Sequence, residues 1–271
     1  MNFLQNFQQI NPVLFWFVLA NVCSAGLFIL LTFTSHKTVN GVNAWYKPFK
    51  FASSTAIYLF TMAWFCSHLP MLDVSLFSWV NVLLFTFEVG YIAIQAGRQQ
   101  ASHFNVSTPF YSVMFGLMGI AAVLIAIYGA YVGWLFFTFT PTTLSAATLW
   151  AIRLSCILFL IFSLEGLMMG SRLSHAVGAA SADHFVPVVK WSKTRGDLRI
   201  AHFVGMHAIQ VIPFLSMTLV KSVGGIVFVS GVYLLFALFV LWQALNGRPL
   251  IQYKDTFKTT ANENNHPSIN K

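Results

Sequence analysis

VSLFSWVNVLLFTFEVGYIAIQAG, residues 74–97, decides the fold, because it is long and apolar enough to cross a membrane and yet carries a carboxylate at Glu88. About twenty apolar residues span the hydrocarbon core of a bilayer. Asn81, Glu88 and Gln95 recur at a spacing of seven, which keeps them within about 40° of one another on a helix. An ionisable group inside a membrane is costly unless it faces a polar interior. The segment therefore predicts a transmembrane helix with a polar stripe, and Tyr91 extends the Glu88 face.

The composition indicates that the whole chain is a membrane protein. Apolar residues make up 57% and charged residues only 8%, whereas about a quarter of the residues in soluble domains are charged. We predict an all-α integral membrane bundle of seven transmembrane helices within residues 1–249, followed by a polar, disordered cytoplasmic tail at 250–271. The predicted spans are 12–33, 50–69, 74–97, 108–136, 144–170, 200–220 and 222–246.

The net charge of +8 is explained by membrane topology and does not require a nucleic-acid partner. Basic residues gather in alternate loops, which by the positive-inside rule are cytoplasmic. This places the N-terminus outside and the C-terminus in the cytoplasm, with the lipid bilayer as the main partner. The residues that decide the orientation are Lys37, Lys47, Lys50, Arg98, Arg172, Lys190, Lys193, Arg195, Arg199, Arg248, Lys254 and Lys258.

Two expectations concern the chain outside its polar sites. The segment 1–11 has no Lys or Arg and precedes a long apolar stretch, so a cleaved secretory signal is not expected. Cys23, Cys66 and Cys156 have no metal-like spacing, and we interpret them as small packing residues.

Glu88, Glu165 and His207 are the strongest candidates for a catalytic site. They lie ten, seven and eight residues from Arg98, Arg172 and Arg199, so all three sit roughly 10 to 15 Å inside the cytoplasmic boundary. Gln210 adds an amide on the His207 face. The hypothesis is a buried Glu/His/Gln site open to the cytoplasm. Its predicted rim consists of Arg98, His103, Arg172, His175, Asp197, Arg199 and His202.

A structural interpretation competes with this site. Arg153 is also deep in the membrane, and an ion pair with Glu88 would offset much of the desolvation cost of both groups. In that case Glu165 is left to interact with His207. The same polar residues, Asn81 included, could simply join helices by hydrogen bonds.

The cofactor is left open between a metal, a haem and none. His202 and His207 are five residues apart, about 140° around a helix, so they do not chelate one ion as a pair. A metal would need Glu88, Glu165 and His207 from different helices. A haem would need His207 or His202 on one side and His103 or His175 on the other.

The loop at 175–198 and the glycine pairs each allow two interpretations. The loop is long and mixed in composition, so it is either a folded lid or an interfacial loop anchored by Trp191. Asp197 suits the N-cap of the sixth span, although the same exposed amides could hold an anion beside Arg199. Glycine pairs at 129 and 133 and at 166 and 170 suit close packing inside the bundle or dimerisation.

Three stretches, 45–51, 95–105 and 196–210, resemble motifs of an uncharacterised family of bacterial multi-pass membrane proteins. The resemblance implies a location in the bacterial inner membrane and carries no activity with it.

Three functions fit these residues. The first is a membrane-embedded enzyme or redox protein that acts on a lipid or other membrane-soluble substrate. The second is a proton-coupled transporter whose path is lined by Asn81, Glu88 and Gln95. The third is a non-catalytic sensor or assembly subunit.

Overall fold

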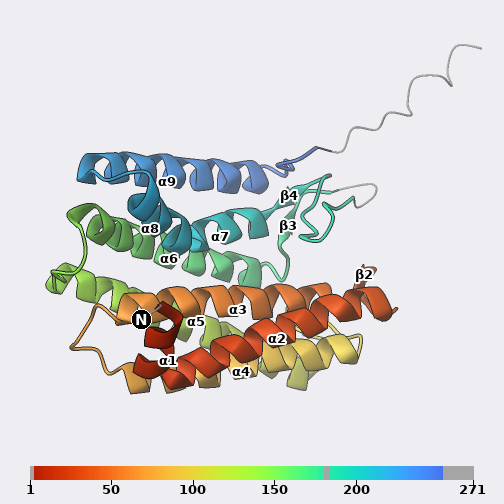
Figure 1. The fold of residues 1–271 in the computed structure, drawn as a ribbon. Helices are drawn as coiled ribbons and strands as arrows, with labels where there is room; N and C mark the ends of the chain where they lie inside the picture. The colour runs from red at the N-terminus through yellow and green to blue at the C-terminus, as the bar shows by residue number, and fades with distance from the viewer. Residues whose placement is uncertain (1–2, 180–183, 253–271) are drawn as a thin grey trace, which may run out of the picture.

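The computed structural model describes residues 3–179 and 184–252 and is mostly helical (Figure 1). The predicted disordered tail therefore lies outside the described residues from position 253 onward. The short helix α1, which the sequence did not predict, precedes the first long one. The helices are α1 (Phe3–Ile10), α2 (Pro12–Thr34), α3 (Tyr46–Cys66), α4 (Val74–Gly97), α5 (Pro109–Thr138), α6 (Ala146–Ser171), α7 (Leu198–Met206), α8 (Ala208–Thr218) and α9 (Val223–Leu245).

Two short antiparallel strand pairs lie at one end of the bundle, which we call the hairpin end (Figure 1). Strands β1 (Thr38–Val39) and β2 (Val42–Asn43) are joined by a turn at Asn40 and Gly41, whose φ angles are 50° and 74°. A turn with two residues at positive φ is the usual two-residue hairpin connection. Strands β3 (Ala176–Val177) and β4 (Gly196–Asp197) pair across the loop that follows α6.

Several helices are suited to a bilayer. Helices α2, α4, α5, α6 and α9 are each long and apolar enough to span it, and α7 and α8 are a sixth candidate if this bent pair is counted as one span. Large apolar side chains such as Phe33, Leu83 and Phe228 are more than two-thirds exposed, as expected where lipid replaces water. Helix α3 is not among the helices that are apolar enough to span the bilayer. Five or six apolar helices indicate a membrane-embedded protein.

The predicted span at 200–220 consists of two helices, α7 and α8, which meet at His207 with a bend of 42°. In an unbroken helix the Ala208 N–H would donate to the carbonyl of Val204. Here the hydroxyl of Tyr233 in α9 donates to that carbonyl at 2.6 Å. A side chain inserted into the backbone ladder is a known cause of helix kinks, and the sequence pattern of α7 gives no sign of it.

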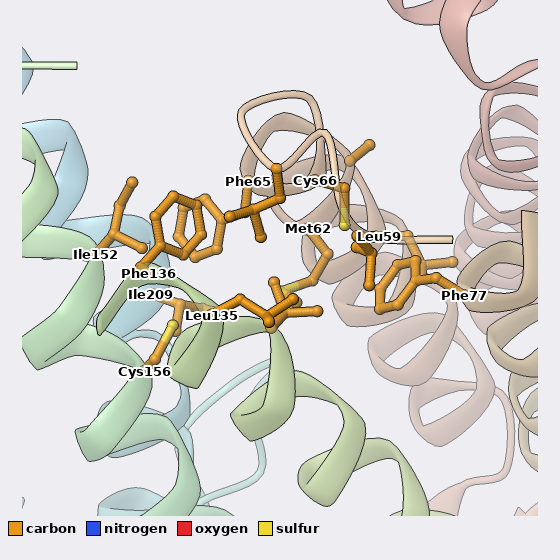
Figure 2. Packing of buried hydrophobic residues seen from close by; sticks show 14 of the residues in the cluster. Leu59, Met62, Phe65, Cys66, Phe77, Leu135, Phe136, Ile152, Cys156 and Ile209 are labelled. Atoms are coloured by element: carbon orange, nitrogen blue, oxygen red, sulfur yellow. The ribbon is translucent and has the colours of Figure 1, made fainter. Parts of the chain in front are cut away.

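The main core lies between α2, α3, α4, α5 and α6. Phe65, Phe77 and Phe136 are fully buried and meet Leu59 and Met62 of α3 (Figure 2). Cys66 and Cys156 belong to the same cluster and are free thiols, which agrees with a packing role; Cys23 is free but exposed. A second cluster joins α6 to the three helices that follow it. Its fully buried members are Ala151, Phe162, Ala201, Ala208, Ile212, Ile226 and Ala237.

The glycine pairs face neighbours within the bundle. A Cβ at Gly129 would lie 2.9 Å from the Phe159 ring, and one at Gly133 would lie 2.5 Å from Cys156 Cβ. A Cβ at Gly166 would lie 2.8 Å from the His202 ring. Small residues let helices approach closely in membranes, so close packing of α6 against α5 and α7 accounts for these three glycines.

Candidate functional site

The polar stripe of α4 lies inside the bundle. Asn81, Glu88 and Gln95 are 1%, 5% and 1% exposed. Two of them donate along their own helix, Asn81 Nδ2 to the carbonyl of Phe77 at 2.8 Å and Gln95 Nε2 to the hydroxyl of Tyr91 at 2.7 Å. One oxygen of each stripe residue, Asn81 Oδ1, Glu88 Oε1 and Gln95 Oε1, is buried without a hydrogen-bond donor among the described residues. The stripe therefore presents three acceptors.

The ion pair between Glu88 and Arg153, which the structural interpretation of the sequence allowed, is not formed. Arg153 Nε donates to the carbonyl of Phe136 at 2.8 Å, and its guanidinium lies over the rings of Trp150 and Phe137. A carbonyl and two aromatic faces satisfy this cation without a carboxylate. The comparison of the two residues' depths in the membrane could not detect this, because two groups at similar depth can face opposite sides of a bundle.

Glu88 interacts electrostatically with Lys47, at the start of α3. Long Lys side chains reach along a helix and place their charge away from the backbone. In the sequence Lys47 was used only to assign the topology. Its charge also acts on the buried ring of His103, so the start of α3, Glu88 of α4 and His103 share one electrostatic environment.

Glu165 meets His202, not His207. The Glu165 side chain is buried, and its Oε2 lies 3.5 Å from His202 Nδ1. The same nitrogen lies 2.7 Å from the carbonyl of Phe162, which can only accept a hydrogen bond. Nδ1 therefore carries a proton, and Nε2 of a neutral His202 is the free acceptor. Neither oxygen of Glu165 has a hydrogen-bond partner among the described residues.

A chain of hydrogen bonds fixes the tautomer of His207. The hydroxyl of Thr61 donates to the carbonyl of Ile57 at 2.8 Å and accepts from Gln210 Nε2 at 3.2 Å. Gln210 Oε1 is then turned to His207 Nδ1 at 3.1 Å. An amide oxygen only accepts, so Nδ1 carries the proton and Nε2 of the neutral ring is unprotonated. Thr61 of α3, which no sequence pattern singled out, thus orients His207 at the break between α7 and α8.

The candidate residues form two groups instead of one. Glu88 belongs to the α4 group with Lys47 and Gln95, whereas Glu165, His202 and His207 belong to the group around α6, α7 and α8. His202 and His207 are close enough for their charges to interact. His202 was predicted to lie on the rim because only its depth in the membrane was considered. The structure places its ring against Glu165 and in the space left by Gly166.

The metal and haem sets named from the sequence are not assembled. Within residues 3–179 and 184–252, no group of three or more His, Cys, Asp or Glu side chains could hold a metal ion. His103 is packed among the rings of Phe51, Phe104 and Phe115, and His175 faces Asp197. Neither of these histidines contacts His202 or His207.

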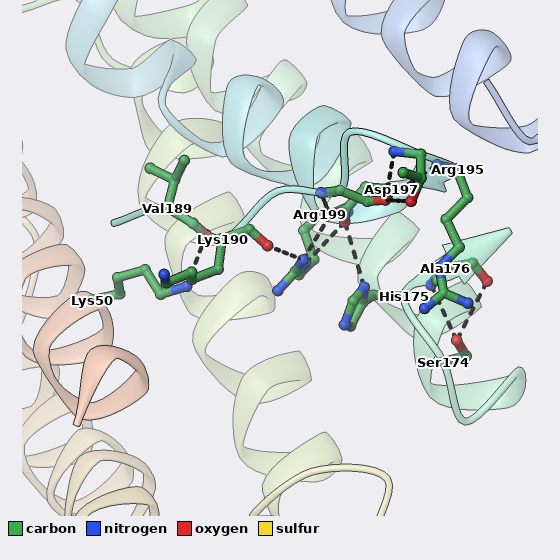
Figure 3. Close-up of polar contacts among 11 residues, drawn as sticks. Lys50, Ser174, His175, Ala176, Val189, Lys190, Arg195, Asp197 and Arg199 are labelled. Atoms are coloured by element: carbon green, nitrogen blue, oxygen red, sulfur yellow. Dashed lines mark hydrogen bonds and ion pairs between the residues drawn. The ribbon is translucent and has the colours of Figure 1, made fainter. Parts of the chain in front are cut away.

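Asp197 organises the hairpin end. It is 1% exposed and caps α7 by accepting from the Arg199 N–H at 3.2 Å. The Arg199 guanidinium donates to both carboxylate oxygens, at 2.9 and 2.6 Å, and the Ser192 N–H donates at 3.0 Å (Figure 3). Burial alone would raise the pKa of Asp197, but hydrogen bonds and charge from Arg199 and His175 hold that pKa well below its usual range. The Asp197 carboxylate therefore lies where a bound anion beside Arg199 was the alternative interpretation of the sequence.

The loop at 175–198 was predicted as either a folded lid or an interfacial loop, and its residues 184–198 form backbone hydrogen bonds with one another. The N–H of Val186 donates to the carbonyl of Trp191, and the N–H of Lys193 donates to that of His184. Arg199 Nη2 donates to the carbonyl of Lys190 at 2.7 Å, and Lys50 Nζ donates to that of Val189 at 3.1 Å (Figure 3). Two cations of the bundle therefore hold this segment at the hairpin end.

The remaining rim residues lie near the same end. Arg98 and Arg172 are the C-cap residues of α4 and α6. The ring of His103 is enclosed by aromatic side chains, and burial together with the charge of Lys47 holds its pKa well below its usual range. The three stretches of the family resemblance meet here, since Phe51 contacts His103 and Lys50 interacts with Arg199.

Comparison of the chain with models of protein families, with curated proteins and with solved structures gives no match.

Proposed function

We propose that the protein is a proton-coupled transporter of the bacterial inner membrane, in which Glu165, His202 and His207 form the proton relay. The observation that carries the proposal is the buried Glu165 carboxylate, which finds no hydrogen-bond donor among the described residues and lies 3.5 Å from His202 beside a broken helix. A series of Glu and His side chains inside the membrane is typical of proton relays. Broken helices are typical of the substrate and ion sites of transporters.

The proposal includes seven spans in one domain of residues 1–249. Helix α3 is the seventh span, since its 21 residues rise roughly 31 Å, close to the thickness of the hydrocarbon core. Its polar first turns then lie at the membrane surface. With seven spans the N-terminus is outside and the hairpin end, which carries most of the Lys and Arg residues, is cytoplasmic.

The tautomers suggest how a proton would move. A proton arriving at Nε2 of His202 makes the ring an imidazolium, and the ring can then release the other proton from Nδ1 to Glu165 Oε2. A small rotation of the ring, from the Phe162 carbonyl toward the carboxylate, suffices because both acceptors lie within 3.5 Å of Nδ1. The ring is left as the opposite neutral tautomer, and the charges balance at each step.

His202 and His207 would be protonated alternately. Two imidazolium rings in electrostatic contact disfavour each other, so a proton on one ring favours its loss from the other. Gln210 and Thr61 keep Nε2 of His207 as the accepting atom. They act as positioning residues.

Acid–base chemistry on a membrane-soluble substrate is the second candidate. The folded segment 184–198, tied to the bundle by Lys50 and Arg199, favours it, because an enzyme needs a cover that excludes water from the reacting groups. The same three residues would supply the acid and the base.

The test uses purified protein in liposomes that contain the pH-sensitive dye pyranine. An acid pulse outside should give a proton flux above that of empty liposomes, and Glu165→Gln should reduce it at least tenfold. Asp73→Asn is the matched control, because Asp73 is an exposed N-cap remote from the relay and Asn caps equally well. Thr61→Val should slow the flux while leaving the thermal midpoint nearly unchanged.

A wild-type flux equal to that of empty liposomes would overturn the transport proposal. A flux indifferent to Glu165→Gln but lost in Glu88→Gln would move the relay to the α4 stripe, whose three buried acceptors then line the path.

A further inference from the structure

Four cations from three segments converge at the hairpin end. Lys47 and Lys50 lie in the first turns of α3, Lys190 in the segment 184–198 and Arg199 in the first turn of α7. They repel one another, since Lys50 interacts with Arg199 and Lys190, and Lys47 interacts with Lys50 and Arg199. Such a cluster destabilises the fold unless anions balance it.

The carboxylates of the same region offset this charge only in part. Asp197 is occupied by two nitrogens of the Arg199 guanidinium and by His175 at 3.5 Å. It acts on Lys50 only through space, as Glu88 does on Lys47. Among residues 3–179 and 184–252, no carboxylate forms an ion pair with Lys47, Lys50 or Lys190. Three ammonium groups are therefore held together without a direct counter-ion.

The backbone is shaped to keep Lys190 in this cluster. Val188 and Lys190 have φ angles of 63° and 57°, a region that bulky and β-branched side chains rarely adopt and that costs of order 1 kcal/mol or more. The bend brings the Lys190 ammonium 4.9 Å from the centre of the Tyr46 ring and turns the carbonyl of Val189 to Lys50 (Figure 3). Strain of this kind tends to mark binding sites.

The start of α3 adds to the positive potential. The positive end of its helix dipole lies beside Lys47 and Lys50, and among the described residues no side chain caps its first turn. Trp45 and Tyr46 have the amphipathic aromatic character found at the level of lipid headgroups. The cluster thus combines a membrane-surface position with excess positive charge.

We propose that Lys47, Lys50 and Lys190 form a binding site for a phosphate group, supplied by the headgroup of an acidic phospholipid. Basic pockets between transmembrane helices on the cytoplasmic side bind such headgroups. Among residues 3–179 and 184–252 each ammonium has donors without an acceptor, since Lys50 donates one to Val189 and an ammonium has three. A phosphate would bridge α3 to the segment 184–198 and offset the repulsion between them.

The experiment measures lipid retention by native mass spectrometry of the full chain in a delipidating detergent. The probes are phosphatidylglycerol, phosphatidylcholine with the same acyl chains, and inorganic phosphate as a competitor. We expect selective retention of phosphatidylglycerol. Each of Lys47→Gln, Lys50→Gln and Lys190→Gln should weaken it about fivefold, the effect of about 1 kcal/mol per Lys near an anionic surface.

Lys37→Gln is the matched control, because it removes the same charge from an exposed Lys at the same end of the bundle. Lys50→Arg keeps the charge and should retain most of the binding, which separates the loss of charge from misfolding. Competition by millimolar inorganic phosphate would support the site and identify free phosphate as an alternative source. Equal retention of both lipids without any effect of phosphate, or an equal loss in Lys37→Gln and Lys190→Gln, would overturn the proposal.

Discussion

Asp197→Asn should separate the charge of this carboxylate from its capping role. Asn caps helices as well as Asp does, so the bond from the Arg199 N–H can survive the substitution. The bidentate pair with the Arg199 guanidinium cannot. Removing one partner of a buried pair costs about 3–5 kcal/mol. The Arg199 side chain is 28% exposed, so solvent screening should reduce the loss to roughly 2–3 kcal/mol.

The loss should be concentrated in the segment 184–198. Ser192 donates to Asp197 and Arg199 holds the carbonyl of Lys190, so the guanidinium and the segment are released together. Hydrogen–deuterium exchange in detergent should show faster exchange at these amides, and the thermal midpoint should fall. Asp73→Asn, at the exposed N-cap of α4, should change neither measurement.

The pH dependence gives an independent check. A carboxyl whose pKa is lowered by folding stabilises the protein above its unfolded value of about 3.9, and this stabilisation is lost as the pH falls toward the folded value. Wild-type protein should therefore lose protection of the segment 184–198 below about pH 4, and Asp197→Asn should lack this dependence. Equal exchange in wild type and Asp197→Asn at pH 7 would refute the assigned role of the ion pair.

Three further substitutions test the packing around the polar groups. His103→Phe should reduce the loss of stability between pH 7 and pH 5, because a histidine whose pKa is lowered by burial must gain a proton on unfolding. The measurement is the thermal midpoint at both pH values, and an unchanged difference between the two midpoints would contradict a buried neutral ring. Gly205→Ala should destabilise by about 1–3 kcal/mol, because its Cβ would lie 1.9 Å from Phe162 Cγ, whereas Gly119→Ala, with nothing within 4 Å, should be neutral in thermal denaturation. Arg153→Gln should leave the proton flux unchanged, because its partners are Phe136, Phe137 and Trp150; a lost flux would show that Arg153 acts on the relay.

Periodicity and charge predicted the helices well, because membrane helices are chosen by length and apolarity. The N-cap role of Asp197 is confirmed, since it depends on local chemistry. At the break near His207, the carbonyl of Val204 accepts from the hydroxyl of Tyr233, which is 29 residues away in the sequence. No local pattern contains that contact.

Depth was less informative than direction around the helix. Glu88 and Glu165 were placed at one level, but their neighbours are Lys47 and His202. The seven-residue spacing of Asn81, Glu88 and Gln95 predicted a common buried face, because it specifies the angle around the helix axis as well as the position along it. For Glu165 no second polar residue on α6 indicated such an angle, and depth alone favoured His207 as the partner where the structure has His202.

The scarcity of acidic residues strengthens the assignment of the relay. The chain has only seven, and the structure describes four of them: Asp73, Glu88, Glu165 and Asp197. Asp73 and Asp197 cap helices at the two ends of the bundle. Glu88 and Glu165 cap nothing, and each leaves a buried oxygen without a donor. Two buried carboxylates impose a cost that packing alone could avoid with Leu or Met, so their presence is best explained by protons or ligands that they exchange.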